Sequence, residues 1–105
     1  MKRLEINIPI YDQRVIVLQH DDHLEVTEYL NNAYDVKITP KGDAWCTVMP
    51  NNEIIMVFLP KVSDAFIVHE CVHAAFALND LLGIHDEENI CYFTEYLFNQ
   101  IKNYV

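Results

Sequence analysis

Two histidines four residues apart, with a glutamate directly after the first, are the residues of this sequence best suited to chemistry. His69, Glu70 and His73 form an H-E-x-x-H pattern inside an apolar stretch over residues 65–82. If that stretch is a helix, residues four apart share one face, about 6 Å apart along the axis, so both imidazoles can reach one ion. Glu70 is turned by about 100° from His69, so it lies beside the ion and can take a proton from water on the metal.

Zinc is the metal that these side chains suit. It accepts imidazole nitrogen and carboxylate oxygen in tetrahedral geometry and tolerates an open position that holds water. Zinc lowers the pKa of that water toward about 7, which makes hydrolysis of a peptide or amide bond the natural reaction. The competing interpretation is that His69 and His73 are satisfied core residues without a metal. We favour the metal, because burying two histidines and a glutamate on an apolar helix is costly unless they have partners.

The elements expected around this helix make a small α+β domain. Four stretches have the alternating or β-branched pattern of strands, and they are residues 3–10, 15–18, 44–49 and 53–59. Asp21 and Asp22 can cap a helix over about residues 23–33, whose apolar face should cover one side of the sheet. The last two strands flank the turn residues 50–52, so they are expected to form a hairpin.

Two further helices complete the expected fold. Residues 65–82 follow a cap at Ser63 or Asp64 and are apolar on nearly every face, so this helix is expected in the middle of the fold. A connection over residues 83–86, with a C-cap glycine and an N-cap aspartate, leads to an antiparallel helix over residues 87–103. We therefore expect a small, mostly antiparallel sheet packed on a central H-E-x-x-H helix and on a C-terminal antiparallel helix.

Composition limits the partners and the compartment. Residues 1–105 have the length and the 51% hydrophobic content of one compact domain, with 7 Lys and Arg against 16 Asp and Glu and a net charge of −9. Such a charge makes nucleic acid a poor candidate partner and favours cations over acidic substrates. The 3 cysteines form no C-x-x-C pair, and the N-terminus lacks the apolar core of a signal peptide, so we expect a cytoplasmic protein. No apolar run approaches the roughly 20 residues that cross a bilayer, so no membrane partner is expected.

These features make the sequence similar to the zincin metallopeptidases, and more narrowly to small metallopeptidases encoded by phages and mobile elements. The H-E-x-x-H pattern is the specific part of this resemblance, which covers most of the chain. The softer matches are Ile8-Pro9-Ile10, an apolar strand ending at Pro60, Leu82-Gly83-Ile84, and Glu88 followed by Tyr92, Glu95, Tyr96, Leu97 and Phe98.

The resemblance implies that a third zinc ligand comes from the helix after the H-E-x-x-H helix. In such proteins it is a glutamate at the start of that helix, which matches Glu88 here. Hairpin geometry keeps Glu95 as an alternative. A tight bend near residues 83–86 places Glu95 opposite His73, whereas a wider bend that begins near Asn79 favours Glu88.

Three further positions have both a functional and a structural interpretation. Tyr92 lies four residues after Glu88 on the same helical face, where its phenol could stabilise an oxyanion, or it is a core tyrosine. His85 could do the same or be a fourth ligand, but an exposed loop histidine is favoured. Residues 53–58 match the zincin edge strand that binds substrate by main-chain pairing, although a buried central strand explains the apolar run equally well.

The sequence thus predicts a minimal zincin that hydrolyses a peptide or isopeptide bond in a peptide or protein substrate. Zn²⁺ is held by His69, His73 and Glu88, with Glu70 as the general base and Tyr92 as a second catalytic residue. The alternative is a small phage or mobile-element binding protein with a structural or catalytically idle zinc site. A metal-free acidic interaction domain comes third. The substrate and the oligomeric state are not specified by the sequence.

Overall fold

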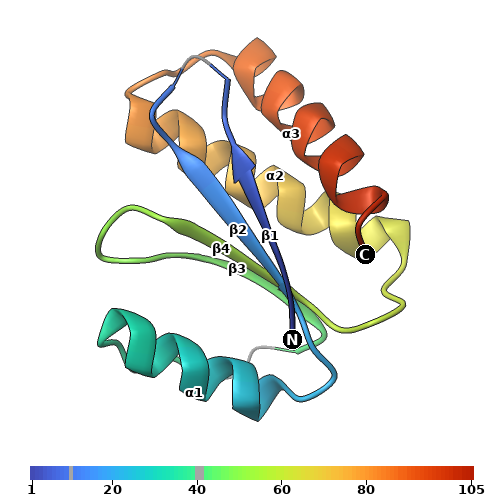
Figure 1. Ribbon diagram of the computed structural model, residues 1–105. Coiled ribbons are helices and arrows are strands. Elements are labelled where there is room, and N and C mark those ends of the chain that lie inside the picture. The colour runs from blue at the N-terminus through green and yellow to red at the C-terminus, as the bar shows by residue number, and fades with distance from the viewer. Residues whose placement is uncertain (10, 40–41) are drawn as a thin grey trace.

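The computed structural model describes residues 1–9, 11–39 and 42–105 (Figure 1). Within these ranges the chain forms four strands and three helices, in the order β1 (Lys2–Asn7), β2 (Arg14–Gln19), α1 (His23–Tyr34), β3 (Ala44–Val48), β4 (Ile54–Phe58), α2 (Asp64–Leu82) and α3 (Glu87–Lys102). All of the predicted elements are present. The first strand is shorter than predicted, and Ile10, which the prediction included, lies outside the described residues.

The strands form a mixed sheet in the order β1-β2-β4-β3. β1 pairs antiparallel with β2, and β3 pairs antiparallel with β4, which confirms the predicted hairpin. The central pair is parallel, with Val15 opposite Ile54 and Gln19 opposite Phe58. The α+β class is confirmed, but the parallel centre was not predicted. It arises because α1 and β3 lie between β2 and β4 in the chain: β3 runs opposite to β2, and the β3–β4 hairpin then returns the chain in the direction of β2.

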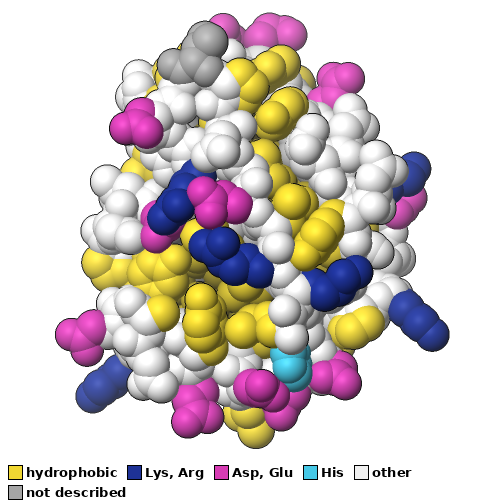
Figure 2. Space-filling model, viewed as in Figure 1, with side chains coloured by type: hydrophobic (Ala, Val, Ile, Leu, Met, Phe, Trp, Pro, Cys, Tyr) yellow, Lys and Arg dark blue, Asp and Glu magenta, His cyan; other side chains and the backbone are white. Residues whose placement is uncertain are grey.

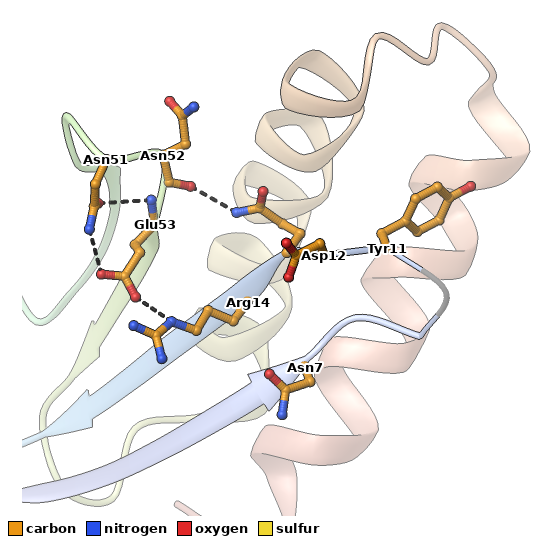
Figure 3. A pocket seen from close by; sticks show the side chains of 8 residues that line it. Asn7, Tyr11, Asp12, Arg14, Asn51, Asn52 and Glu53 are labelled. Carbon is orange, nitrogen blue, oxygen red and sulfur yellow. Dashed lines mark hydrogen bonds and ion pairs between the residues drawn. The ribbon is translucent and has the colours of Figure 1, made fainter.

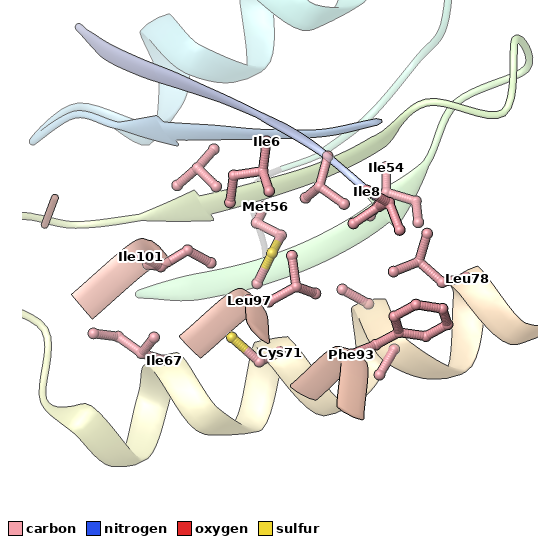
Figure 4. Packing of buried hydrophobic residues seen from close by; sticks show 14 of the residues in the cluster. Ile6, Ile8, Ile54, Met56, Ile67, Cys71, Leu78, Phe93, Leu97 and Ile101 are labelled. Carbon is pink, nitrogen blue, oxygen red and sulfur yellow. The ribbon is translucent and has the colours of Figure 1, made fainter. Parts of the chain in front are cut away.

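Helices cover both faces of the sheet. α1 lies on one face, as predicted, while α2 and α3 lie together on the other (Figure 1). The core on the α1 side consists of Ile16, Leu18, Val26, Leu30, Trp45, Met49, Ile55 and Val57. The larger core lies between the sheet and the helix pair, where Met56 of β4, Cys71 of α2 and Leu97 of α3 come together (Figure 4). β2 and β4 contribute to both cores because successive side chains of a strand point to opposite faces.

α2 buries only one side, so the prediction that it lies in the middle of the fold is wrong in this respect. Its inner side, which includes Cys71, Ala74 and Leu78, is fully buried against the sheet and α3. Its outer side leaves 46% of Phe66 and 53% of Phe76 exposed. An all-round apolar composition indicates that a helix can be covered on every face, but it does not determine how many faces the rest of the chain covers.

By length and composition alone, α2 would also suffice to cross a membrane, which the sequence analysis did not anticipate. The core helix of a globular domain passes the same test. Because the inner side of α2 packs in the larger core, this property carries no argument for a membrane.

A tight connection joins α2 to α3. Gly83 ends α2 with φ of 68°, a left-handed conformation that glycine adopts without steric cost. The side chain of Asp86 caps α3 by accepting a hydrogen bond from the backbone N–H of Glu88 at 2.9 Å. The Nδ2 group of Asn79 donates to the Asp86 carbonyl oxygen at 3.1 Å and holds the bend. The predicted antiparallel pair of helices is confirmed. The bend is the tight one over residues 83–86 rather than the wider one that begins near Asn79.

Candidate metal centre

His69 and His73 approach each other from consecutive turns of α2. Their Nε2 atoms are 3.2 Å apart, and their ring centroids are 4.8 Å apart with 71° between the ring planes. Both side chains are exposed to solvent. Two nitrogens that each lie about 2.0–2.1 Å from one zinc ion are about 3.3–3.4 Å apart at the tetrahedral angle, so the pair fits two ligands of one ion. A hydrogen bond between the rings also fits this distance, so the geometry permits a metal without requiring it.

Glu70 lies beside the histidine pair and is nearly buried, with 6% of the residue exposed. Burial raises the pKa of the Cys46 and Cys71 thiols to about 12, and the negative charge of Glu70 contributes to both shifts. The carboxylate is therefore close to the thiols of half-buried Cys46 and buried Cys71. A carboxylate in such surroundings is costly unless a cation compensates it. A zinc ion on the neighbouring histidines would supply that positive charge, so Glu70 and the histidine pair are compatible with a metal.

Glu70 lies between two open hollows that follow β3. The first has a volume of about 440 Å³ and is lined by Gly42, Asp43, Ala44, Ala65, Phe66, His69 and Glu70. The second has a volume of about 370 Å³ and is lined by Ala44, Trp45, Cys46, Thr47, Val48, Glu70, His73 and Ala77. Since Ala44 and Glu70 line both hollows, they form a groove between β3 and α2, with one histidine at each hollow.

β3 turns an unpaired main-chain edge toward this groove, because it is the last strand of the sheet. Hydrogen bonds from Met49 N to Glu53 O at 2.8 Å and from Leu59 N to Asp43 O at 3.0 Å continue the β3–β4 ladder at its two ends. In an antiparallel pair, residues alternate between bonding to the partner strand and pointing away from it. The register therefore directs outward the N–H and C=O groups of Ala44, Cys46 and Val48.

The strand that the sequence analysis considered for substrate pairing does not have a free edge. β4, residues Ile54–Phe58, lies between β2 and β3, and all of its side chains are buried. The alternative of a buried central strand is thus confirmed. The edge belongs to β3, whose short and mixed sequence gave no signal strong enough to distinguish it from the inner strand.

Within residues 1–9, 11–39 and 42–105, a third ligand does not join the histidine pair. No group of three His, Cys, Asp or Glu side chains in these ranges is placed to hold one metal ion. Glu88 is exposed in the first turn of α3, near the bend. Glu95 lies further along α3, in a groove that also contains Val68 and Val72 of α2. α3 packs against the side of α2 that carries Val68 and Val72, whereas His69 and His73 line the hollows on the β3 side of α2. A carboxylate of α3 would therefore have to extend around α2 to reach the imidazoles.

Tyr92 lies away from the histidine pair. It is 51% exposed, stacks on Tyr96 with a centroid distance of 6.2 Å, and lines a hollow with Pro9 and Tyr11. The residues of α3 that line a groove with α2 do not include Tyr92 or Glu88, so this packing gives no support to the predicted catalytic role of Tyr92. His85 is exposed in the connection between α2 and α3, as expected for a loop histidine.

A separate polar hollow lies where the β1–β2 connection meets the β3–β4 turn (Figure 3). Here Arg14 forms ion pairs with Glu5 and Glu53, and the Tyr34 hydroxyl donates to Glu53 at 3.1 Å. Burial, aided by the Glu53 carboxylate, raises the pKa of Tyr34 to about 12. Arg14 pairs with Glu5 and Glu53, and Gln13 Nε2 donates to Asn52 O at 2.8 Å across the two loops, so these contacts have a structural explanation.

Comparisons with known proteins add no family to this picture. No protein-family model matches the chain, and no curated protein or solved structure is significantly similar to it. The candidate site therefore depends on its own geometry. Asp43 and Ala44 also line the site but were not predicted, because they lie in a turn and at the start of a strand and belong to no motif.

Proposed function

We propose that this chain is a zinc-dependent metallopeptidase that hydrolyses a peptide or isopeptide bond. The observation that carries the proposal is the 3.2 Å approach of the His69 and His73 Nε2 atoms next to the nearly buried Glu70. These three residues hold the two ligand roles and the base role of an H-E-x-x-H site. The groove along β3 supplies a place for an extended substrate beside them.

Each residue has a defined part in this mechanism. His69 and His73 would hold zinc through Nε2, and the metal, when bound, polarises the carbonyl of the reacting bond and activates water. Glu70 takes a proton from the water and then delivers it to the leaving amine, so one carboxylate serves both steps. The free edge of β3 holds the peptide main chain by β-augmentation.

A glutamate of α3 remains our expectation for the third ligand. The tight bend at residues 83–86 places Glu95 level with His73, whereas Glu88 is level with the end of α2, roughly 12 Å away along the axis at 1.5 Å per residue. Among the described residues, neither carboxylate joins the histidine pair in a group of three metal ligands. Zinc affinities of Glu88→Gln and Glu95→Gln will identify the ligand, because only the variant that loses a ligand binds zinc more weakly.

Glu70→Gln is the direct test of the proposed chemistry. The amide keeps the shape of the side chain but cannot accept the proton, so the variant should bind zinc as the parent chain does and lose about 10²–10⁴-fold in peptide cleavage. Cleavage of a quenched-fluorescent peptide library by the zinc-loaded chain is the assay. Glu28→Gln on α1 is the matched control, because this exposed residue lies on the opposite side of the sheet. Unchanged turnover in Glu70→Gln would exclude Glu70 as the base.

The second candidate function is a binding protein with a structural or idle zinc site. Two observations favour a binding protein. Among the described residues, no third ligand joins the histidine pair, and the outer side of α2 exposes Phe66 and Phe76. X-ray absorption on the zinc-loaded protein separates the candidates. A shell closed by a fourth protein ligand, such as His85, indicates a structural site, whereas an open position for water indicates catalysis.

A further inference from the structure

The two ends of the groove differ in chemistry. The hollow at His69 is lined by Asp43, which is acidic, and by Phe66, which is 46% exposed. The hollow at His73 is lined by β3 and Ala77 and, among the described residues, contains no acidic side chain except Glu70, which both hollows share. Successive side chains of an extended peptide in this groove would therefore meet different surroundings.

We propose that the hollow at His69 selects a lysine or arginine side chain of the substrate. The cationic group pairs with the carboxylate of Asp43, and the side chain lies against the ring of Phe66 by cation–π and apolar contact. Ala44 and Ala65 add little bulk, and the volume of about 440 Å³ accommodates a long side chain. The inference rests on the proposed peptidase function and names its substrate class.

Charge decides between a basic and an apolar occupant. An apolar side chain would also contact Phe66, but only a cationic side chain would in addition attract the carboxylate of Asp43, which lines the same hollow. The net charge of −9 acts in the same direction, since it attracts basic peptides and repels acidic ones. Acidic side chains are scattered over the visible surface rather than gathered in one patch (Figure 2). The long-range electrostatic field therefore attracts basic peptides to the whole molecule, and Asp43 selects the basic side chain at the hollow.

The selected residue lies close to the reacting bond. Glu70 and His69 line the same hollow as Asp43, so the basic side chain belongs to a residue on the side of the bond that faces the start of β3. The residue on the other side of the bond enters the hollow at His73, where Val48 and Ala77 suit an uncharged side chain.

Two measurements on matched peptides test this inference. Quenched-fluorescent peptides carry lysine, glutamine or glutamate at one scanned position and are otherwise identical. Their cleavage is measured with the zinc-loaded chain, and their binding is measured by fluorescence polarisation with zinc-loaded Glu70→Gln. We expect lysine to exceed glutamine by about two- to fivefold, as for an exposed ion pair, and glutamate to be weakest. Asp43→Asn should remove the preference, Asp43→Lys should reverse it, and Glu28→Gln, with the same charge change as Asp43→Asn, should keep it.

The outcomes separate this inference from the proposed function. Cleavage without a preference for lysine, or a preference that survives in Asp43→Asn, overturns the inference and leaves the peptidase in place. Binding that prefers lysine without any cleavage supports the hollow and overturns the peptidase. If neither cleavage nor a binding preference is found, both are overturned.

Discussion

Two proline substitutions in β3 should have opposite effects on stability, because the register assigns alternate residues to the ladder and to the free edge. Ala44 points its N–H outward, so Ala44→Pro removes no ladder hydrogen bond and should change the free energy of unfolding by about 0 to +1 kcal/mol. Thr47 donates toward Ile55, which is fully buried. Thr47→Pro loses that bond and leaves a buried carbonyl unsatisfied, at a combined cost of about 2–4 kcal/mol.

Urea unfolding followed by circular dichroism measures both free energies. Equal destabilisation by Ala44→Pro and Thr47→Pro would refute the assignment of the free edge, whatever the function of the chain. Ala44→Pro also tests whether the substrate pairs with β3. The variant loses one main-chain hydrogen bond to the substrate, which is worth about 0.5–1.5 kcal/mol, so it should reduce peptide cleavage by about 2- to 13-fold. Ala44→Val, which keeps the N–H and adds similar bulk, is the control; an equal loss in both variants would refute main-chain pairing.

Three further predictions concern the cysteines and the core. At pH 8, iodoacetamide should modify exposed Cys91 and spare Cys46 and Cys71 until urea is added, and mass spectrometry showing further modification of the native chain would contradict this. Folding raises the pKa of the Cys46 and Cys71 thiols from 9.0 to about 12, so the folded state holds these protons more tightly than the unfolded state. Their contribution to the free energy of unfolding is therefore full below pH 9 and is lost as the pH rises toward 12. Urea titrations across that range should show falling stability, and a flat profile would contradict it. Leu97→Ala should cost about 2–5 kcal/mol in the same assay, and Leu24→Ala, at a residue 71% exposed, well under 1 kcal/mol; similar costs would contradict the packing of α3.

Local signals in the sequence were sufficient for the helices and for the histidine pair. The spacing of His69 and His73 determines their approach because helical periodicity is a property of the backbone alone. Asp22, Ser63 and Gly83 fix helix ends through hydrogen bonds and backbone conformations within a few residues, and the structure has all three as caps.

Non-local arrangements were beyond the reach of the sequence. The apolar run of β4 fits an edge or a centre equally well, and only its pairing with β2 and β3 places it inside the sheet. The orientation of Glu88 and Tyr92 depends on how α3 is rotated against α2, which the side chains packed between the two helices decide. Ala44 joined the candidate site only through tertiary contact between β3 and α2.

Long-range ¹H–¹⁵N NMR of the histidine rings during titration with zinc tests most directly whether His69 and His73 share one metal ion. One equivalent of zinc should shift the Nε2 resonances of His69 and His73 together. His20, His23 and His85 lie outside the pair and serve as controls in the same spectrum. Unchanged resonances of His69 and His73, or a shift of only one of them, would contradict a shared metal ion and with it the proposed hydrolase.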